Sequence, residues 1–278
     1  MNLALAEAPL VGRAFTENDV LRLEEAFLQE EQVDCPVTHH FGPGVYIREV
    51  TMPTGAYIIG HDHKHPQFNI MLQGRLTLIR NDGTQQELTA PQTFVGSPGK
   101  KIAFIHETVR WQNVYATTET DVEALEEWLY KPSDNLADAR QLLLTHSVTE
   151  NREDYAAALR DLGMTEDDAE QIWGGAVGPM PHGSYKTQTS ASTIHGRGLF
   201  STAEIAAHEM IAPARVGGMW TPAGRFTNHS RMPNAEWVAS ENGDLYLFAT
   251  ADISGCKGGI LGEEITLDYR HALPLGAK

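Results

Sequence analysis

The stretch RFTNHSRMPN at residues 225–234, followed by GEEITLDY at residues 262–269, carries the strongest pattern in the chain. A third stretch, IHGRGLF at residues 194–200, precedes both. In this order, glycines that permit a close approach of the backbone come before polar side chains, a rigid Pro-Asn bend and a tyrosine. Each stretch alone is typical of an ordinary turn, a surface loop or a packed aromatic residue. The indication of function therefore depends on all three occurring together.

Together the three stretches resemble the pattern of SET domains, which are S-adenosylmethionine-dependent protein lysine methyltransferases. The resemblance covers roughly the last third of the chain and implies a minimal SET β fold. It also implies that the segment with Asn228 passes beneath the 262–269 segment in a knot-like crossing, and that both contact S-adenosyl-L-methionine. The residues that it assigns to the cofactor are Gly196, Arg197, Gly198, Leu199, Arg225, Phe226, Asn228, His229 and Tyr269.

The resemblance also assigns Tyr269 the catalytic role of orienting the incoming amine and the methyl group. Because the sulfonium already activates the methyl group, positioning dominates the chemistry, and Glu263 and Glu264 are expected to serve structure. Arg231 stands where many relatives have Cys, and no cysteine cluster follows Tyr269. We therefore expect no zinc-bound lid, and we expect the tail 271–275 or a partner subunit to close the lysine channel.

The region from Val45 to Ala116 reads as short β-rich runs separated by turn signals at Gly74, at 81–83 and at 98–99, which predicts an antiparallel barrel or sandwich. Within it, Gly55, His61, His63 and Gly74 match the first cupin signature in every spacing, with Gln67 where a glutamate ligand is usual. This resemblance implies a cupin-like β-barrel, or jelly roll. The pattern looks like small cupin modules encoded by bacteriophages, in which the barrel often mediates association, so a homodimer is expected.

A divalent metal is a second possible cofactor of this chain. His61 and His63 lie two residues apart, so on a strand both would project to one side, as metal ligands must. The second cupin signature is broken near Ile102, and His106 lies an even number of residues further along, so a strand could present it on the same side. The candidate metal ligands are therefore His61, His63, Gln67 and His106, against the alternative of a metal-free barrel.

The two resemblances and the helical spacing between them divide the chain into three expected parts. These are a cupin-like barrel with an N-terminal helix over 1–120, a helical linker over 121–183 and the SET domain over 184–278. The fold class is mainly β with a helical linker. Thr16 caps the first helix, which is expected to end near Glu31. Thr165 and Asp168 form a capping pair for a linker helix, and the glycine-rich segment 174–183 marks a boundary.

The formal net charge is −16, which repels phosphate backbones and makes nucleic acid a poor partner. A lysine-bearing protein is attracted instead. Residues 1–15 lack a basic leader and a long apolar stretch, so neither a signal peptide nor a membrane anchor is expected. Cys35 and Cys256 are the only cysteines and have no CxxC spacing, which fits a protein of a reducing cytoplasm. If the chain is phage-encoded, the expected location is the host cytoplasm or the virion.

Three functions remain open from the sequence. The first is methyl transfer to a protein lysine ε-amine. The second is a non-catalytic structural or assembly protein, for instance of a virion, in which both folds serve as scaffolds. The third is a cupin dioxygenase or isomerase that uses iron or manganese at His61, His63 and His106. The missing glutamate and the displaced third histidine count against the third.

Overall fold

The computed structural model describes residues 16–80, 82–133 and 148–277. Residues 1–15, Asn81 of an expected turn and residues 134–147 of the expected linker lie outside the described residues. The structure is 42% strand and 21% helix, which confirms the mainly β class.

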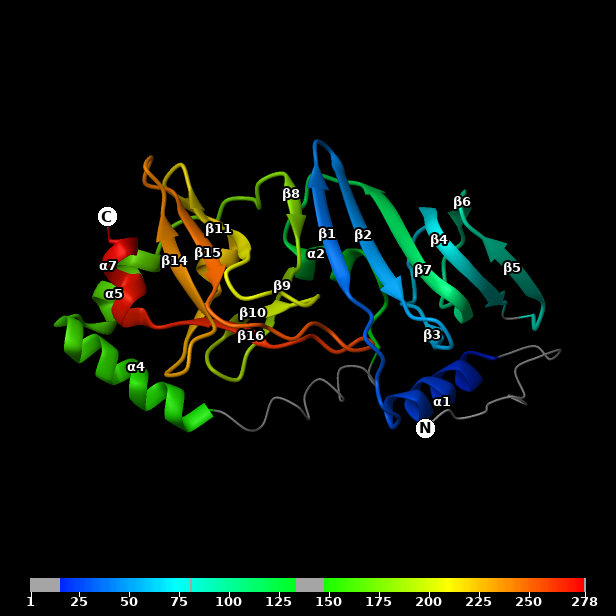
Figure 1. Ribbon diagram of the computed structural model, residues 1–278, viewed down its shortest axis with the longest axis horizontal. Coiled ribbons are helices and arrows are strands. Elements are labelled where there is room, and N and C mark those ends of the chain that lie inside the picture. Colours follow the sequence, from blue (N-terminus) through cyan, green and yellow to red (C-terminus); the bar gives the residue numbers. More distant parts are fainter. Residues whose placement is uncertain (1–15, 81, 134–147, 278) are drawn as a thin grey trace.

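The N-terminal part forms an eight-stranded sheet (Figure 1). Its strands are β1 (Val37–Gly42), β2 (Val45–Met52), β3 (Tyr57–Ile59), β4 (Gln67–Ile79), β5 (Gln85–Thr89), β6 (Gln92–Gly96), β7 (Ile102–Ala116) and β8 (Gly183–Tyr185). The long strands β4 and β7 pair along most of their length, but their first and second halves have different further neighbours. The sheet therefore has two halves, and side chains from both line one interior pocket.

Gly74 lies inside β4, where the sequence pattern predicts a turn between two strands. The strand continues because Gly74 adopts φ +90°, and the β4–β7 register shifts on both sides of Gln73. A residue with positive φ inside a strand forms a bulge that bends the strand without ending it. The bulge thus separates the two halves of the sheet.

Replacing Gly74 by Ala is expected to lower the free energy of unfolding by at least about 2 kcal/mol. A Cβ there would meet the carbonyl oxygen of Glu107 at 2.7 Å and that of Thr108 still closer, in addition to the strained φ. Gly55 is the matched control, because it has φ +83° but a Cβ would meet nothing within 4 Å. Urea unfolding should show a smaller loss for Gly55→Ala, and equal losses would contradict this account.

Helix α1 (Glu17–Leu28) packs on the N-terminal sheet near β3 (Figure 1). Thr16 caps it through a capping box with Asp19, which confirms the predicted cap, and the helix ends at Leu28, slightly before the expected end. Val20 packs with Ile79 and Ile102 in a small buried cluster. The outward face of this end of the sheet is therefore covered by α1.

The C-terminal part holds two four-stranded sheets, ordered β13-β16-β10-β9 and β12-β11-β15-β14. Their strands are β9 (Thr187–Ala191), β10 (Arg197–Ser201), β11 (Met210–Val216), β12 (Met219–Trp220), β13 (Asn228–His229), β14 (Ala235–Ala239), β15 (Leu245–Ala249) and β16 (Glu264–Leu267). The helices of the linker and C-terminal part are α2 (Val122–Leu129), α4 (Val148–Leu162), α5 (Glu166–Trp173), α6 (Pro222–Arg225) and α7 (Tyr269–Gly276). The predicted Thr165–Asp168 capping box is present at α5.

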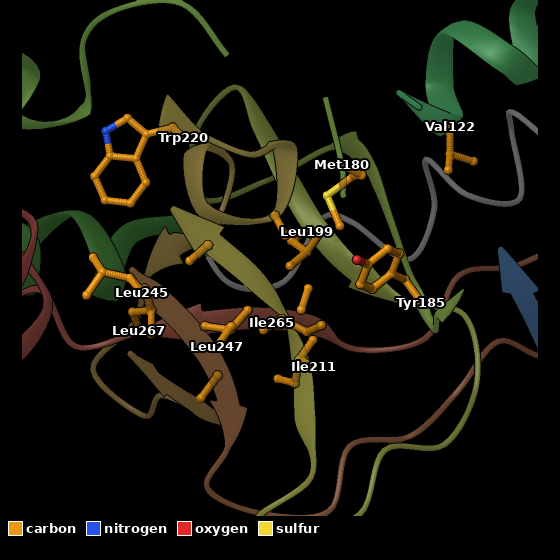
Figure 2. Packing of buried hydrophobic residues seen from close by; sticks show 14 of the residues in the cluster. Val122, Met180, Tyr185, Leu199, Ile211, Trp220, Leu245, Leu247, Ile265 and Leu267 are labelled. Atoms are coloured by element: carbon orange, nitrogen blue, oxygen red, sulfur yellow. The ribbon is translucent and has the colours of Figure 1, made fainter. Parts of the chain in front are cut away.

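One hydrophobic core connects the N-terminal sheet with the C-terminal sheets. It runs from Tyr46 and Tyr115 through Leu125 of α2 to Leu199 and Ile265, and Figure 2 shows the C-terminal side of this packing. Strand β8, which spans the division expected at 183/184, pairs with β1 of the N-terminal sheet. The two parts are thus joined by a shared sheet and a shared core as well as by the chain.

The two cysteines lie side by side at this junction, although they are far apart in the sequence. Both are free and buried, and the Cys256 thiol donates to the carbonyl oxygen of Cys35 at 3.1 Å. Next to them, Val37 N–H donates to the Thr202 carbonyl at 2.8 Å. The segment leading into β1 is therefore held by the C-terminal part.

Candidate functional site

Two of the three motif stretches lie side by side in the C-terminal part, and the place where they meet is called the crossing. Strand β13 runs parallel to β16, with Asn228 opposite Thr266 and His229 opposite Leu267. Such short parallel pairing, between segments more than thirty residues apart, brings the end of the 225–234 stretch beside the end of the 262–269 stretch. The third stretch joins them because β10 pairs with β16 at Leu199 and Ile265.

The side-chain amide of Asn228 holds the three stretches together. Its nitrogen lies 3.1 Å from the carbonyl oxygen of His195, 3.0 Å from that of Arg197 and 2.8 Å from Oε1 of Glu264. An amide has only two N–H donors, so these acceptors share them. Because Asn228 is buried, the amide fixes the glycine-containing turn against β16.

Glu264 connects the glycine-containing turn to Asn228, and its expected structural role stays a prediction of the resemblance. Its carboxylate accepts from Ser192 Oγ and from the Asn228 amide. Burial raises the pKa of Glu264, and these two hydrogen bonds lower it. Gly198 is required beside it, because a Cβ there would collide with the Glu264 carboxylate and lie 2.9 Å from Ser192 Cβ.

Tyr269 begins α7, directly after the 262–268 segment, and its hydroxyl turns back toward the crossing. The hydroxyl donates to the carbonyl oxygen of Thr227 at 3.1 Å. Burial raises the pKa of Tyr269, with Tyr155 raising it further and Arg225 lowering it. The phenol therefore stays protonated and serves as a hydrogen-bond donor.

The linker helices surround Tyr269 with aromatic rings, a feature that sequence reasoning missed. The ring of Trp173 from α5 lies 4.9 Å from that of Tyr269, and the ring of Tyr155 from α4 lies 5.8 Å away, edge-on. Helices α4 and α5 both contact α7. The segment treated as a linker thus builds one wall of the candidate site, and the tail 271–275 forms part of α7.

His229 connects the crossing to α4. Its Nδ1 accepts from the Tyr269 N–H at 3.2 Å, so the network assigns the proton to Nε2, which lies 3.0 Å from the Asp154 carboxylate. Arg270 donates to both oxygens of Asp154. Burial lowers the pKa of His229, and Asp154 raises it. The imidazole is used for positioning the backbone at Tyr269.

The two arginines assigned to the cofactor have different surroundings. Arg197 is occupied, because its guanidinium pairs with Asp121 at 3.0 Å and with Glu123 at 2.7 Å. Arg225 lies close enough to Tyr269 to influence its pKa, and within the described residues it forms no ion pair with a carboxylate. Both guanidinium groups lie over the ring of Phe226, at 4.2 and 5.9 Å from its centroid.

The glycine turn itself is open on one side. Gly196 has φ +51°, and a Cβ there would meet nothing within 4 Å. Leu199, in contrast, is buried in the core beneath the turn. Of the two, only Gly196 leaves its backbone accessible to a ligand.

The N-terminal sheet contains a second candidate site, a pocket of about 660 Å³. His61, His63 and Gln67 line it, but residues 61 and 62 are not in a strand. The rings of His61 and His63 lie 4.3 and 5.0 Å from that of Tyr130. The structure therefore brings three of the four expected metal ligands to one pocket.

His106 does not lie in this pocket, contrary to the expectation from its spacing. Its Nε2 lies 2.7 Å from the hydroxyl of Thr77, and its ring packs against Phe104. Ala103 and Ile105 point into the interior, so strand alternation directs His106 to the opposite face. Within residues 16–80, 82–133 and 148–277, no group of three or more His, Cys, Asp or Glu side chains is arranged to hold a metal.

Comparisons with known proteins concern the fold alone. No protein-family model and no curated protein matches the chain. Cupin-domain structures cover about a third of it. A cupin-2 domain protein from Shewanella frigidimarina is 13% identical, covers 34% of this chain and 91% of its own, and has a TM-score of 0.26. The Cnp3 cupin domain of Schizosaccharomyces pombe is 20% identical, with a match that covers 35% of this chain and 73% of the Cnp3 chain, and it has a TM-score of 0.26.

Ectoine synthase from P. lautus is 14% identical, covers 37% of this chain and 80% of its own, and has a TM-score of 0.29. These comparisons give no support to a SET domain or to a phage origin, which stay predictions. In the described part of the chain, none of the helices has the length and apolar character needed to cross a bilayer. The chain is thus a mainly β protein with cupin-like structural neighbours.

Proposed function

We propose that the C-terminal part is an S-adenosylmethionine-dependent methyltransferase that acts on a lysine ε-amine of a protein. The observation that carries the proposal is the crossing of three distant stretches at Asn228, with the Tyr269 hydroxyl directed at the Thr227 carbonyl in the same crossing. Methyl transfer from an activated donor depends mainly on positioning. A phenol held rigidly beside a backbone carbonyl provides two fixed points for orienting an amine.

The residues at the crossing fit S-adenosylmethionine. Gly196 leaves accessible backbone on one side of the turn, and Arg225 is a cation that lies over Phe226, lowers the pKa of Tyr269 and pairs with no carboxylate of the described chain. An arginine fork suits a carboxylate such as that of the amino-acid part of the cofactor. When bound, the cofactor would supply a methyl group already activated by its sulfonium. Arg197, occupied by Asp121 and Glu123, would contribute through its backbone only.

The surroundings of Tyr269 also fit a lysine substrate. The rings of Tyr155 and Trp173 pack against the phenol, and the loss of water beside them disfavours the ammonium form of an incoming lysine, which must lose its proton to react. The net charge of −16 attracts basic proteins over a distance. Both features support a lysine-bearing protein partner.

A homodimer through the N-terminal sheet is part of the proposal. Phe68 and Val95 are opposite each other on β4 and β6, and they are 57% and 61% exposed. Large apolar side chains that are exposed together on a sheet are typical of contact surfaces. This pair supports association of two copies through that sheet.

The full chain is expected to bind S-adenosylmethionine at one site, measured by isothermal titration calorimetry. Replacing Arg225 by Gln should weaken binding by about tenfold or more, because a charge-assisted hydrogen bond is lost. Arg231→Gln is the matched control, since Arg231 is exposed and lies in the same stretch. No heat of binding with the unaltered chain would exclude the methyltransferase and favour the non-catalytic scaffold.

A further inference from the structure

The interior pocket of the N-terminal sheet contains a cation that the proposed function does not use. Arg48 on β2 lines the pocket, and within the described residues its guanidinium group forms no ion pair and no hydrogen bond. Its Nε is buried without a partner. Removing a charge from water is costly unless a partner compensates it, so an unpaired guanidinium in an interior is destabilising on its own.

Arg48 belongs to a row of polar side chains that crosses the inner face of the sheet. Strand register places His39 opposite Arg48, Arg48 opposite Asn113, and Asn113 opposite Asn69. The Asn113 amide donates to Asn69 at 2.7 Å, whereas no such bond reaches Arg48. An inner face of a sheet is normally apolar, so this row is a departure that packing does not explain.

The neighbouring row of side chains on the same face of the sheet, two residues further along β2 from Arg48, is apolar. Val50 lies opposite Trp111, which in turn lies opposite Met71. Trp111 packs edge-on against Phe94 at 5.5 Å, and both rings line the pocket. The pocket thus offers a charged anchor beside an aromatic and aliphatic wall.

Other buried polar atoms in the pocket are also without partners. Oε1 of Gln67 and Oδ1 of Asp62 are buried and form no hydrogen bond within the described chain. The carboxylates that line the pocket are largely neutralised, since Glu24 pairs with Lys100 at 2.7 Å and Asp62 with Lys131 at 3.3 Å. Arg48 is therefore the cation of the polar row that no carboxylate of the described chain pairs with directly, and the Glu126 carboxylate acts on it only from a distance, as one of the groups that raise its pKa.

We infer that this pocket binds a small organic carboxylate with an apolar body, and that Arg48 pairs with the carboxylate. The guanidinium fork matches a carboxylate in geometry, and the volume of about 660 Å³ lies in the range of small-molecule sites. Trp111 and Phe94 contact the apolar body. The site is independent of the crossing at Asn228 and of the proposed methyl transfer.

Fluorine NMR titration of the full chain with para-fluorobenzoate and para-fluorophenylacetate tests the inference, with EDTA present so that no metal mediates binding. Saturable binding is expected, and the neutral para-fluorobenzamide should bind about tenfold or more weakly. No saturable binding of either acid, or equal binding of acid and amide, would overturn the inference. Competition by S-adenosylmethionine would also overturn it, since the carboxylates would then occupy the other site.

Two variants of Arg48 separate binding from a structural role. Arg48→Gln should weaken para-fluorobenzoate binding by about tenfold or more, whereas Arg110→Gln, on the exposed side of β7, should leave it unchanged. Arg48→Met should raise the melting temperature of the ligand-free chain by about 2 °C or more, because it removes an uncompensated buried charge. A lowered melting temperature of Arg48→Met would identify a structural arginine and overturn the inference.

Discussion

Replacing Tyr269 by Phe is expected to lower the rate of methyl transfer to a lysine-bearing protein by about 100-fold or more while S-adenosylmethionine still binds. The hydroxyl is held by the Thr227 carbonyl at 3.1 Å, so it is positioned before any substrate arrives. Burial keeps it protonated by raising its pKa. The substitution removes this one oxygen and retains the ring that packs against Trp173.

Tyr185→Phe is the matched control for this loss. Tyr185 is buried in the shared core against which Tyr269 packs, and its hydroxyl also donates to a backbone carbonyl, that of Pro181, at 3.0 Å. Both variants therefore lose one tyrosine-to-carbonyl hydrogen bond, worth about 1 kcal/mol of stability. Mass spectrometry of candidate substrates with labelled cofactor measures transfer, and similar rates for the two variants would show that the Tyr269 hydroxyl has no role in the reaction.

The candidate site was predictable from the sequence to the extent that its residues lie in contiguous stretches. Gly198 and Asn228 are recognisable by residue type and local spacing, and the structure brings both to Glu264. The parallel pairing of β13 with β16 was available only through the resemblance. Two-residue strands carry no periodicity, so their partner cannot be read from the local pattern.

The wall formed by Tyr155 and Trp173 was not predictable as part of a site. Both residues lie on helices whose apolar spacing predicts only that one face is buried, not what that face contacts. The one available signal was chemical: Asp154 stands next to Tyr155, and a carboxylate at the buried edge of a helix needs a partner. Its partners, His229 and Arg270, are known only from the tertiary structure.

The error at His106 has a similar origin. The even number of residues between Ile102 and His106 correctly predicts that both side chains lie on the same face of β7. That face is not the one that lines the pocket, because α1 covers it at Ile102. Spacing alone does not indicate which face of a strand is the interior. The same limit applies to Arg48, where a charged residue in an alternating strand would ordinarily be read as facing solvent.

Lowering the pH from about 7.5 to about 5 is expected to reduce the free energy of unfolding by roughly 2 kcal/mol through His39 and by a similar amount through His63. Burial lowers the pKa of His39 to about 3, with Arg48 and His40 lowering it further. Burial also lowers the pKa of His63 to about 4, assisted by Arg48 and Lys101 and opposed by Asp62. Both histidines are therefore neutral in the folded chain at pH 5.

The direction follows from proton uptake. In the unfolded chain a histidine has a pKa near 6.5, so below that pH the unfolded state binds a proton that the folded state does not bind. The free energy of unfolding therefore falls as the pH is lowered, until the pH reaches the pKa of the folded state. Ordinary carboxylates titrate near pH 4, below the window between about pH 6.5 and 5. The Glu264 carboxyl, whose pKa burial raises, is the same in every variant and cancels in their comparison. Urea unfolding at several pH values in this window measures the slope.

His39→Asn should make the stability less dependent on pH by up to about 1.4 kcal/mol per pH unit at the acidic end of this window, since one proton-binding difference is removed. It also removes the hydrogen bond between His39 Nδ1 and the Tyr46 hydroxyl, so the variant is expected to be less stable at neutral pH. Only the slope identifies the titration. His208→Asn is the control, because His208 is exposed and Asn tolerates its positive φ of 68°. An unchanged slope in His39→Asn would show that His39 accepts a proton in the folded chain, and that the polar row around Arg48 is open to water.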